Sequence, residues 1–171
     1  KKNKTLIFFH GNAGNLNNRI YKINELNKLD INILLVSWRG FSGNRGKPTE
    51  KGLYEDGRAT INWIKQKGVD QKNIILYGES LGTGVATQMS LDFDVSGLIL
   101  ESPYTSMVDA AKLYYPYLPV GLLLKDRYEN SKKIDKITIP VLIMHGQKDN
   151  IVPVEMSYTL LKLIKGEKYS Y

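Results

Sequence analysis

Short strand-like apolar runs alternate with helix-like stripes along almost the whole chain. Thr5 to Phe9 is a continuous run, as in a strand buried on both faces, and Ile31 to Trp38 is again apolar and β-branched. Between them, apolar residues recur every three or four positions from Asn15 to Leu29, which predicts a helix. Strands that alternate with helices through short connections favour a mainly parallel sheet covered on both sides. We therefore predict a three-layer α/β/α sandwich.

The same alternation continues to the last residue. Further strands are predicted at Asn73 to Tyr77, Val95 to Leu100, Pro140 to Met144 and Lys168 to Tyr171. Further helices are predicted at Leu53 to Lys67 (closed by Gly68), Leu81 to Leu91 and Val154 to Ile164. Two segments show no regular pattern and are predicted as irregular, Arg39 to Thr49 and Thr105 to Arg127.

The strongest local signal lies between a predicted strand and a predicted helix. Gly78, Ser80 and Gly82 fit the pattern G-x-S-x-G, in which a tight turn lifts a serine hydroxyl clear of the backbone. Glycines are needed because the turn leaves no room for side chains at those two positions. The start of the following helix offers backbone amides to a developing negative charge. We therefore predict Ser80 as the nucleophile of a hydrolase.

An acidic residue follows a later predicted strand, downstream of this serine. Asp149 lies in the loop after Pro140 to Met144. A carboxylate there fits the chain order Ser…Asp…His of a catalytic triad, in which the acid orients the histidine and stabilises its charged form. An aspartate beside Asn150 is also common in an ordinary turn. Together with Ser80, the pattern favours the catalytic role.

The loop after the first predicted strand suits an oxyanion hole. It reads H-G-N-A-G from His10 to Gly14, and a glycine lets the backbone approach a substrate closely. We expect the amide of Asn12 to point at the oxyanion and the amide of Leu81, directly after the serine, to be the second donor. His10 itself is interpreted as a structural residue that hydrogen-bonds neighbouring loops rather than as a base.

The same glycines allow one competing interpretation. Gly78, Gly82 and Gly84 also fit G-x-x-x-G-x-G, the dinucleotide loop of short-chain dehydrogenases, and Tyr158 with Lys162 forms a Y-x-x-x-K pair. That loop belongs after the first strand of such a fold, whereas two predicted strands precede it here. The pair falls on a predicted amphipathic helix, where surface positions are expected. The serine-hydrolase interpretation is preferred.

Five motif-bearing segments follow one another nearly from end to end of the chain: H-G-N-A-G-N, W-R-G-F-S-G-N-R-G, Y-G-E-S-L-G-T-G, E-S-P-Y-T-S and H-G-Q-K-D-N-I-V-P. This set resembles the alpha/beta-hydrolase-domain branch of the alpha/beta-hydrolase fold, which contains monoacylglycerol-lipase-like enzymes, lysophospholipid lipases and protein depalmitoylases. The resemblance implies a serine hydrolase that cleaves a carboxylic ester or thioester, in a lipid-like or acyl-protein substrate, through an acyl-Ser80 intermediate. It is not specific for the substrate.

The chain departs from that family at the catalytic base. Its two histidines, His10 and His145, both precede Asp149, whereas the family places its base in the loop after the final strand. His145 lies just before the acid and is expected to face the wrong side of the turn. The strands that precede the oxyanion loop in the family are absent as well. We therefore expect a hydrolase domain that is incomplete at both ends and nearly inactive by itself.

Composition argues against several other classes of site. The chain has no cysteine, which excludes disulfides and cysteine-based zinc sites, and neither histidine belongs to a ligand cluster, so no metal or organic cofactor is expected. The net charge of +7 is spread along the chain, which argues against nucleic-acid binding and leaves an attraction to anionic lipid surfaces. No signal peptide or membrane-spanning run is visible, and we expect a cytoplasmic or membrane-associated protein.

One domain is expected over residues 1–171, with a distinct segment at 105–127. This segment combines two prolines with many large apolar side chains, and two interpretations stay open: a small cap over the site, suited to an acyl chain or a membrane surface, or helices packed against the sheet. The absent base supports one alternative to an enzyme, a non-catalytic protein of the same fold that binds a ligand or partner. The sequence leaves the oligomeric state open.

Overall fold

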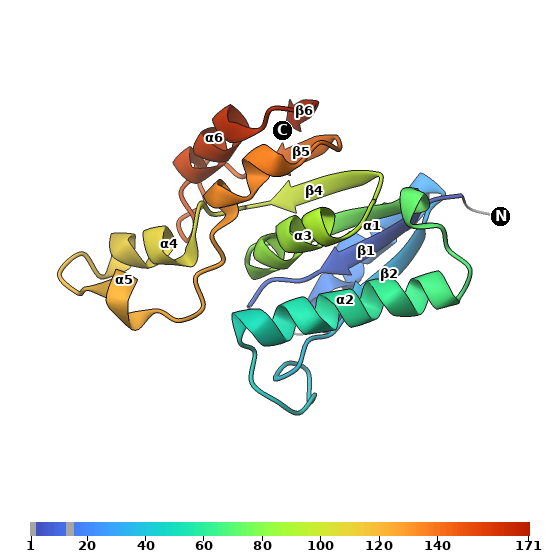
Figure 1. Cartoon of the computed structure of the whole chain (residues 1–171), viewed down its shortest axis with the longest axis horizontal. Helices are drawn as coiled ribbons and strands as arrows, with labels where there is room; N and C mark the ends of the chain where they lie inside the picture. The colour runs from blue at the N-terminus through green and yellow to red at the C-terminus, as the bar shows by residue number, and fades with distance from the viewer. Residues whose placement is uncertain (1–2, 13–15) are drawn as a thin grey trace.

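A six-stranded sheet runs through the computed structural model, which describes residues 3–12 and 16–171 (Figure 1). The strand order is β2-β1-β3-β4-β5-β6, and every neighbouring pair is parallel. The strands are β1 (Thr5–Phe9), β2 (Asn32–Val36), β3 (Ile74–Glu79), β4 (Gly97–Glu101), β5 (Val141–Met144) and β6 (Lys168–Ser170). The predicted parallel sheet is confirmed.

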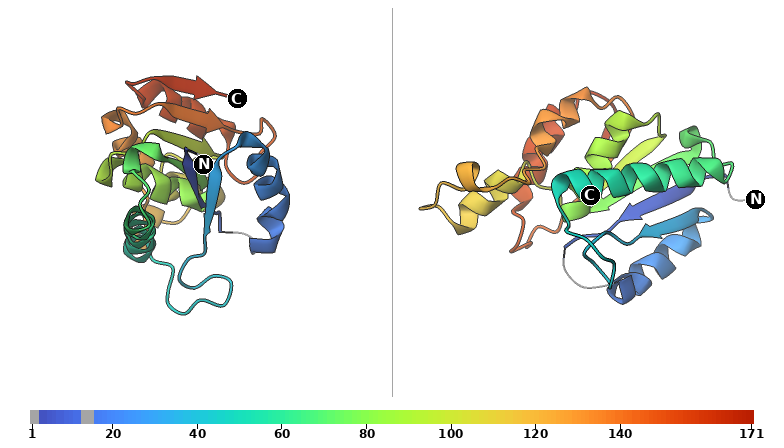
Figure 2. Two further views of the ribbon diagram at one scale, coloured as in Figure 1. Left: turned by 90° about the vertical axis from the view of Figure 1, so that its right-hand side faces the viewer. Right: turned by 60° about the horizontal axis from the view of Figure 1, so that its bottom comes forward.

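Helices cover both faces of this sheet (Figure 2). The helices are α1 (Ile20–Leu26), α2 (Glu50–Gln66), α3 (Leu81–Asp92), α4 (Met107–Tyr114), α5 (Val120–Leu123) and α6 (Val154–Leu163). Short 3₁₀ turns lie between them, namely η1 (Leu16–Arg19), η2 (Asn27–Leu29), η3 (Gln71–Asn73), η4 (Asn130–Lys132) and η5 (Ile134–Lys136). α1 lies on one face, and α2, α3 and α6 pack on the other, which gives the predicted three-layer sandwich.

Each face of the sheet has its own apolar cluster because side chains alternate along a strand. In β1, Ile7 and Phe9 belong to the larger cluster with α2, α3 and α6, whereas Leu6 and Phe8 belong to a smaller one beside α1. All of β1 is buried, which explains why its sequence is continuously apolar. Packing from both sides therefore fixes the carboxyl ends of the central strands.

The first helix differs from the expectation of one helix over Asn15 to Leu29. Asn15 lies outside the described residues, and the rest forms η1, α1 and η2 in succession. α1 has only seven residues, none of them buried, and Ile20 and Leu29 are 54% and 60% exposed. No side chain caps its start, and Asp30 ends the segment in the left-handed conformation (φ 47°). A short uncapped helix on a partly covered face cannot bury a full apolar stripe.

The starts of two further helices, α2 and α4, differ from the prediction because a side chain caps each of them. α2 begins three residues before the predicted Leu53, since the Thr49 hydroxyl accepts a hydrogen bond from the amide of Gly52 at 3.1 Å. The predicted stop at Gly68 is confirmed, with φ at +86°. The segment 105–127 was predicted as irregular but contains α4 and α5. Ser106 caps the start of α4, because its hydroxyl accepts a hydrogen bond from the amide of Asp109 at 2.9 Å.

Candidate active site

Ser80 stands on the sharp turn between β3 and α3. Its backbone has φ 49° and ψ −115°, a conformation that costs energy for any residue other than glycine. The turn is held because the Ser80 amide donates to the carbonyl of Glu101, at the end of β4, at 2.9 Å. Ser80 is half-buried, and within the described chain its hydroxyl has no hydrogen-bond partner. A strained serine with a free hydroxyl is what the elbow pattern predicts.

The glycines around Ser80 bring backbone against backbone. A side-chain carbon at Gly78 would lie 2.6 Å from the carbonyl oxygen of Gly82, and one at Gly82 would lie 1.9 Å from the carbonyl oxygen of Phe9. A carbon at Gly84 would lie 2.6 Å from the hydroxyl of Tyr104. The protein itself therefore occupies the space that these glycines leave. A dinucleotide loop needs that space for a pyrophosphate, so the dehydrogenase interpretation is wrong.

The proposed oxyanion donors lie on the two segments that meet at this turn. Leu81 is the first residue of α3, where a backbone amide has no partner within the helix. Gly11 approaches from the other side, since a carbon added to it would lie 3.2 Å from Cβ of Ser80. Asn12 follows Gly11 directly and is exposed, whereas Ala13 and Gly14 of the same motif lie outside the described residues. Gly11 and the start of α3 thus both lie beside the serine.

Asp149 lies in the loop after β5 and is held by several donors. Its Oδ1 accepts from the amides of Ile151 at 2.8 Å and Val152 at 3.0 Å, and the Ser102 hydroxyl donates to it as well. Partial burial acts to raise the pKa of Asp149, but these hydrogen bonds and the neighbouring His145 outweigh it, so the pKa is lowered. The group is therefore a carboxylate at neutral pH, as a triad acid must be.

Ser102 links the acid loop to the elbow. It follows β4 directly, in the left-handed region with φ 47°, and its amide donates to the carbonyl of Met144 at 2.9 Å. The carbonyl of Glu101 therefore holds the amide of Ser80, and the next residue, Ser102, holds Asp149. These contacts bring both predicted catalytic residues to the same edge of the sheet. Ser102 lies in the segment E-S-P-Y-T-S, where the sequence alone assigns it no role. Its contact depends on the order of the strands, which the sequence does not state.

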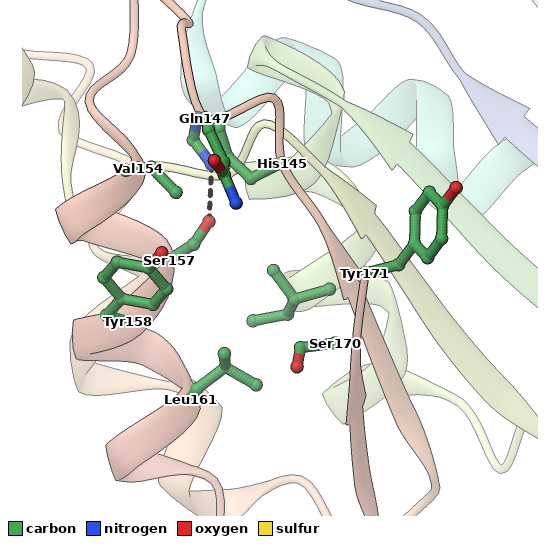
Figure 3. A pocket seen from close by; sticks show the side chains of 9 residues that line it. His145, Gln147, Val154, Ser157, Tyr158, Leu161, Ser170 and Tyr171 are labelled. Atoms are coloured by element: carbon green, nitrogen blue, oxygen red, sulfur yellow. Dashed lines mark hydrogen bonds between the residues drawn. The ribbon is translucent and has the colours of Figure 1, made fainter.

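His145 lies between β5 and α6, with its Nε2 3.5 Å from Oδ2 of Asp149. Its Nε2 donates to the carbonyl of Val152 at 2.7 Å, because a carbonyl can only accept, and its Nδ1 then accepts from the hydroxyl of Ser157 at 2.6 Å. The ring lines a cavity of about 190 Å³ together with residues of α6 and β6 (Figure 3). Both ring nitrogens are therefore engaged in holding the acid loop on α6.

His10 is fully buried beside the first loop. Its Nδ1 donates to the carbonyl of Gly11 at 2.7 Å, and its ring packs against Trp38 and Phe41. Burial lowers the pKa of His10 and outweighs the hydrogen bond to Gly11, which raises it. The side chain is thus a neutral packing element that shapes the loop before Asn12.

The described residues hold no group of three or more histidine, aspartate or glutamate side chains that could bind a metal ion. Within the same part of the chain, none of the helices has the length and apolar character needed to cross a membrane. The predicted site thus has a serine hydroxyl, the start of a helix directly after it and the carboxylate of Asp149.

Comparisons with known proteins agree with this geometry. Residues 4–131 match the family model described as alpha/beta hydrolase fold. An uncharacterized protein of Mycobacterium tuberculosis is 38% identical over 153 residues, 89% of this chain and 54% of that protein. Lysophosphatidylserine lipase ABHD12 of Danio rerio is 31% identical over 183 residues, 95% of this chain and 48% of that protein.

Among solved structures, an alpha-beta hydrolase from Vibrio vulnificus has a TM-score of 0.79 at 27% identity, over 98% of this chain and 68% of that one. The chain spans about half the length of the curated relatives it matches.

Proposed function

The chain belongs to the alpha/beta-hydrolase fold family, and on that premise we propose that it carries the nucleophile and the acid of a serine hydrolase. The observation that supports this most is the backbone of Ser80, held at φ 49° and ψ −115° between β3 and α3 with its hydroxyl free. Strain of this kind persists where the surrounding structure imposes it, commonly at active sites. Nothing in the packing of β3 against α3 requires a serine there.

The proposed reaction is the hydrolysis of a carboxylic ester or thioester. The oxygen of Ser80 attacks the carbonyl carbon while its proton passes to a histidine, and the amides of Asn12 and Leu81 stabilise the resulting oxyanion. The leaving alcohol or thiol takes that proton and an acyl-Ser80 remains. Water then releases the acid by the same steps, while Asp149 orients the histidine. Of the two substrate classes, lipid and acyl-protein, the lipid is supported by the similarity to the lysophosphatidylserine lipase ABHD12 of Danio rerio.

The base in this scheme is a histidine other than His10 and His145, because both of these are engaged elsewhere. We therefore expect the 171-residue chain by itself to turn over ester substrates about a millionfold more slowly than an intact triad. About a thousandfold acceleration over water would remain from the oxyanion hole and binding. The alternative, a non-catalytic protein that binds a ligand or partner, is favoured only by this lack of a base.

Labelling with a fluorophosphonate probe tests the proposal. The full-length gene product and the 171-residue chain are compared, each with a Ser80→Ala variant, after circular dichroism has shown that all four are folded. We expect the full-length product to label at Ser80 within minutes and the 171-residue chain to label far more slowly. Absence of labelling in every folded form would favour the binding protein, and labelling that persists in Ser80→Ala would place the nucleophile elsewhere.

We also propose that the segment 105–127 is a cap that contacts lipid. α4 and α5 project beyond the carboxyl end of the sheet (Figure 1), and large apolar side chains there face solvent: Leu113, Tyr114, Tyr115, Tyr117, Leu118, Leu122 and Leu123. Tyr114 also donates to the carbonyls of Asn150 and Ile151, directly beside Asp149. An apolar patch of this kind, on a chain with a net charge of +7, suits an anionic lipid surface.

The cap proposal predicts a loss of membrane binding when the patch becomes polar. Tyr117, Leu122 and Leu123 are between 63% and 97% exposed, so changing all three to serine should not disturb the core. We expect binding to phosphatidylcholine vesicles with anionic lipid to weaken at least about tenfold, since each side chain loses its apolar burial in the bilayer. The matched control changes three exposed apolar residues outside the segment 105–127 to serine, namely Ile20, Tyr21 and Leu29. Equal effects of the two variants in a sedimentation assay would refute the cap.

A further inference from the structure

A cluster of four charged side chains lies beside the elbow, on the face of the sheet that carries α1. Glu79 and Glu101 end β3 and β4 and stand directly opposite each other in the strand register. Lys22 of α1 bridges them, with Nζ 3.2 Å from Oε2 of Glu79 and 2.5 Å from Oε2 of Glu101. Arg19 donates to Oε1 of Glu79 at 2.9 Å. We call Arg19, Lys22, Glu79 and Glu101 the elbow clamp.

The clamp is more enclosed than an ordinary surface ion pair. The side chain of Arg19 is 6% exposed and that of Glu79 is 20% exposed. Two carboxylates placed opposite each other on neighbouring strands repel, and the two cations balance them, so the cluster has no net charge. Lys22 also lies over the rings of Phe8 and Tyr77, 5.6 Å and 5.9 Å from their centroids, so the cluster rests on the smaller apolar cluster of the sheet.

The clamp reaches the proposed oxyanion donor from both sides. Oε1 of Glu79, which accepts from Arg19, lies 3.2 Å from where a side-chain carbon of Gly11 would stand. Gly11 precedes Asn12, and Arg19 follows the same segment of chain. One carboxylate oxygen of Glu79 therefore lies beside Gly11, directly before Asn12, and pairs with Arg19, which follows later in the chain. The peptide of Glu79 also leads directly into Ser80.

The second carboxylate holds the nucleophile through its backbone. The carbonyl of Glu101 accepts the amide of Ser80, and the Glu101 side chain accepts from Lys22 and from the hydroxyl of Tyr77 at 2.5 Å. The clamp thus ties α1 to the same two strand ends that hold Ser80. Motion of α1 relative to the elbow would change the distance between the amide of Asn12 and the serine oxygen.

We propose that Glu79 is a positioning residue for catalysis, which with Arg19 and Lys22 holds Gly11 and the start of α1 against the elbow so that the Asn12 amide stays aimed at the oxyanion. The inference rests on the proposed function, in which Ser80 is the nucleophile. Glu79 occupies the x position before the serine in G-x-S-x-G, and the inference gives it a role that the glycines and the serine do not have. Errors of about 1 Å in such a geometry can cost about a hundredfold in rate.

The test uses hydrolysis of p-nitrophenyl butyrate by the full-length gene product, with active sites counted by fluorophosphonate labelling. We expect Glu79→Ala to lower kcat per labelled site about tenfold to a hundredfold, with KM changed less than about threefold, since substrate binding does not use the clamp. Glu79→Gln keeps an oxygen for Arg19 and should retain more than about a third of kcat. Adding Arg19→Met to Glu79→Ala should cost less than about twofold more, because the two residues act as one unit.

The control removes an ion pair from the same helix. Glu25 of α1 pairs with Lys28 of the following turn η2, and both side chains are exposed, so Glu25→Ala should leave kcat unchanged. If Glu79→Ala lowers the melting temperature but keeps full kcat per labelled site, the clamp is only structural and the inference is overturned. If Glu79→Ala does not fold, Arg19→Met decides by the same criterion, and its loss of kcat is expected to match the one predicted for Glu79→Ala. Turnover that survives Ser80→Ala would overturn the proposed function itself, an outcome distinct from Ser80-dependent turnover that ignores Glu79.

Discussion

Replacing Gly82 by alanine is expected to destabilise the protein by more than about 3 kcal/mol, beyond the usual cost of overpacking a core. The added carbon would lie 1.9 Å from the carbonyl oxygen and 2.6 Å from the carbonyl carbon of Phe9, and 3.0 Å from the carbonyl oxygen of His10. All three are backbone atoms, so no side chain can rotate away. Either α3 must lift from the sheet or β1, a central and fully buried strand, must shift.

Urea unfolding followed by circular dichroism measures this loss. The matched control is Gly121→Ala in α5, where the nearest atom to an added carbon is Cγ1 of Val108 at an ordinary 3.8 Å. We expect that variant to be within about 1 kcal/mol of the parent, because alanine also favours a helix. A Gly82→Ala protein with the parent's unfolding midpoint would show that β1 and α3 are not in the contact described.

β1 could be predicted from the sequence because burial on both faces leaves a continuous apolar run. β1 begins and ends where that pattern does, and α3 follows the glycine-rich turn that defines its start. Helix ends were harder. The signals at Thr49 and Ser106 are single side-chain hydrogen bonds, which the apolar period does not contain. α1 was overestimated because the period of its apolar residues does not tell how much of the sheet is there to receive them.

The predicted site shows the same division. Ser80 and Asp149 were predicted from local patterns, the G-x-S-x-G turn and a carboxylate in the loop after a later strand, and their catalytic roles stay predictions. Ser102 and the elbow clamp were not found, since their contacts join strands or helices that only the sheet order brings together. The pairing of Glu79 with Glu101 follows from the β3–β4 register, which a single sequence does not state. Long-range polar contacts are therefore the part that needs the structure.

Changing Asp149 to asparagine is expected to lower kcat of the full-length gene product about ten-thousandfold while the fold is kept. Asparagine retains one oxygen, which can still accept from the amides of Ile151 and Val152. Its amide group, however, replaces the second carboxylate oxygen with a donor. A histidine that needs an acceptor there is then held in the wrong tautomer and cannot take the proton of Ser80.

Measuring both the unfolding free energy and the turnover of Asp149→Asn shows whether Asp149 acts in the triad. Loss of a merely structural carboxylate would lower the unfolding free energy and leave turnover per folded molecule intact. The control Asp135→Asn removes a charge of the same kind from an exposed pair with Lys165 and should change neither quantity. Turnover of Asp149→Asn within tenfold of the parent, measured with p-nitrophenyl butyrate, would reject Asp149 as the acid. Because the pKa of Asp149 is lowered, the carboxylate stays charged down to acidic pH, and we expect any loss of turnover on mild acidification to follow protonation of the histidine rather than of Asp149.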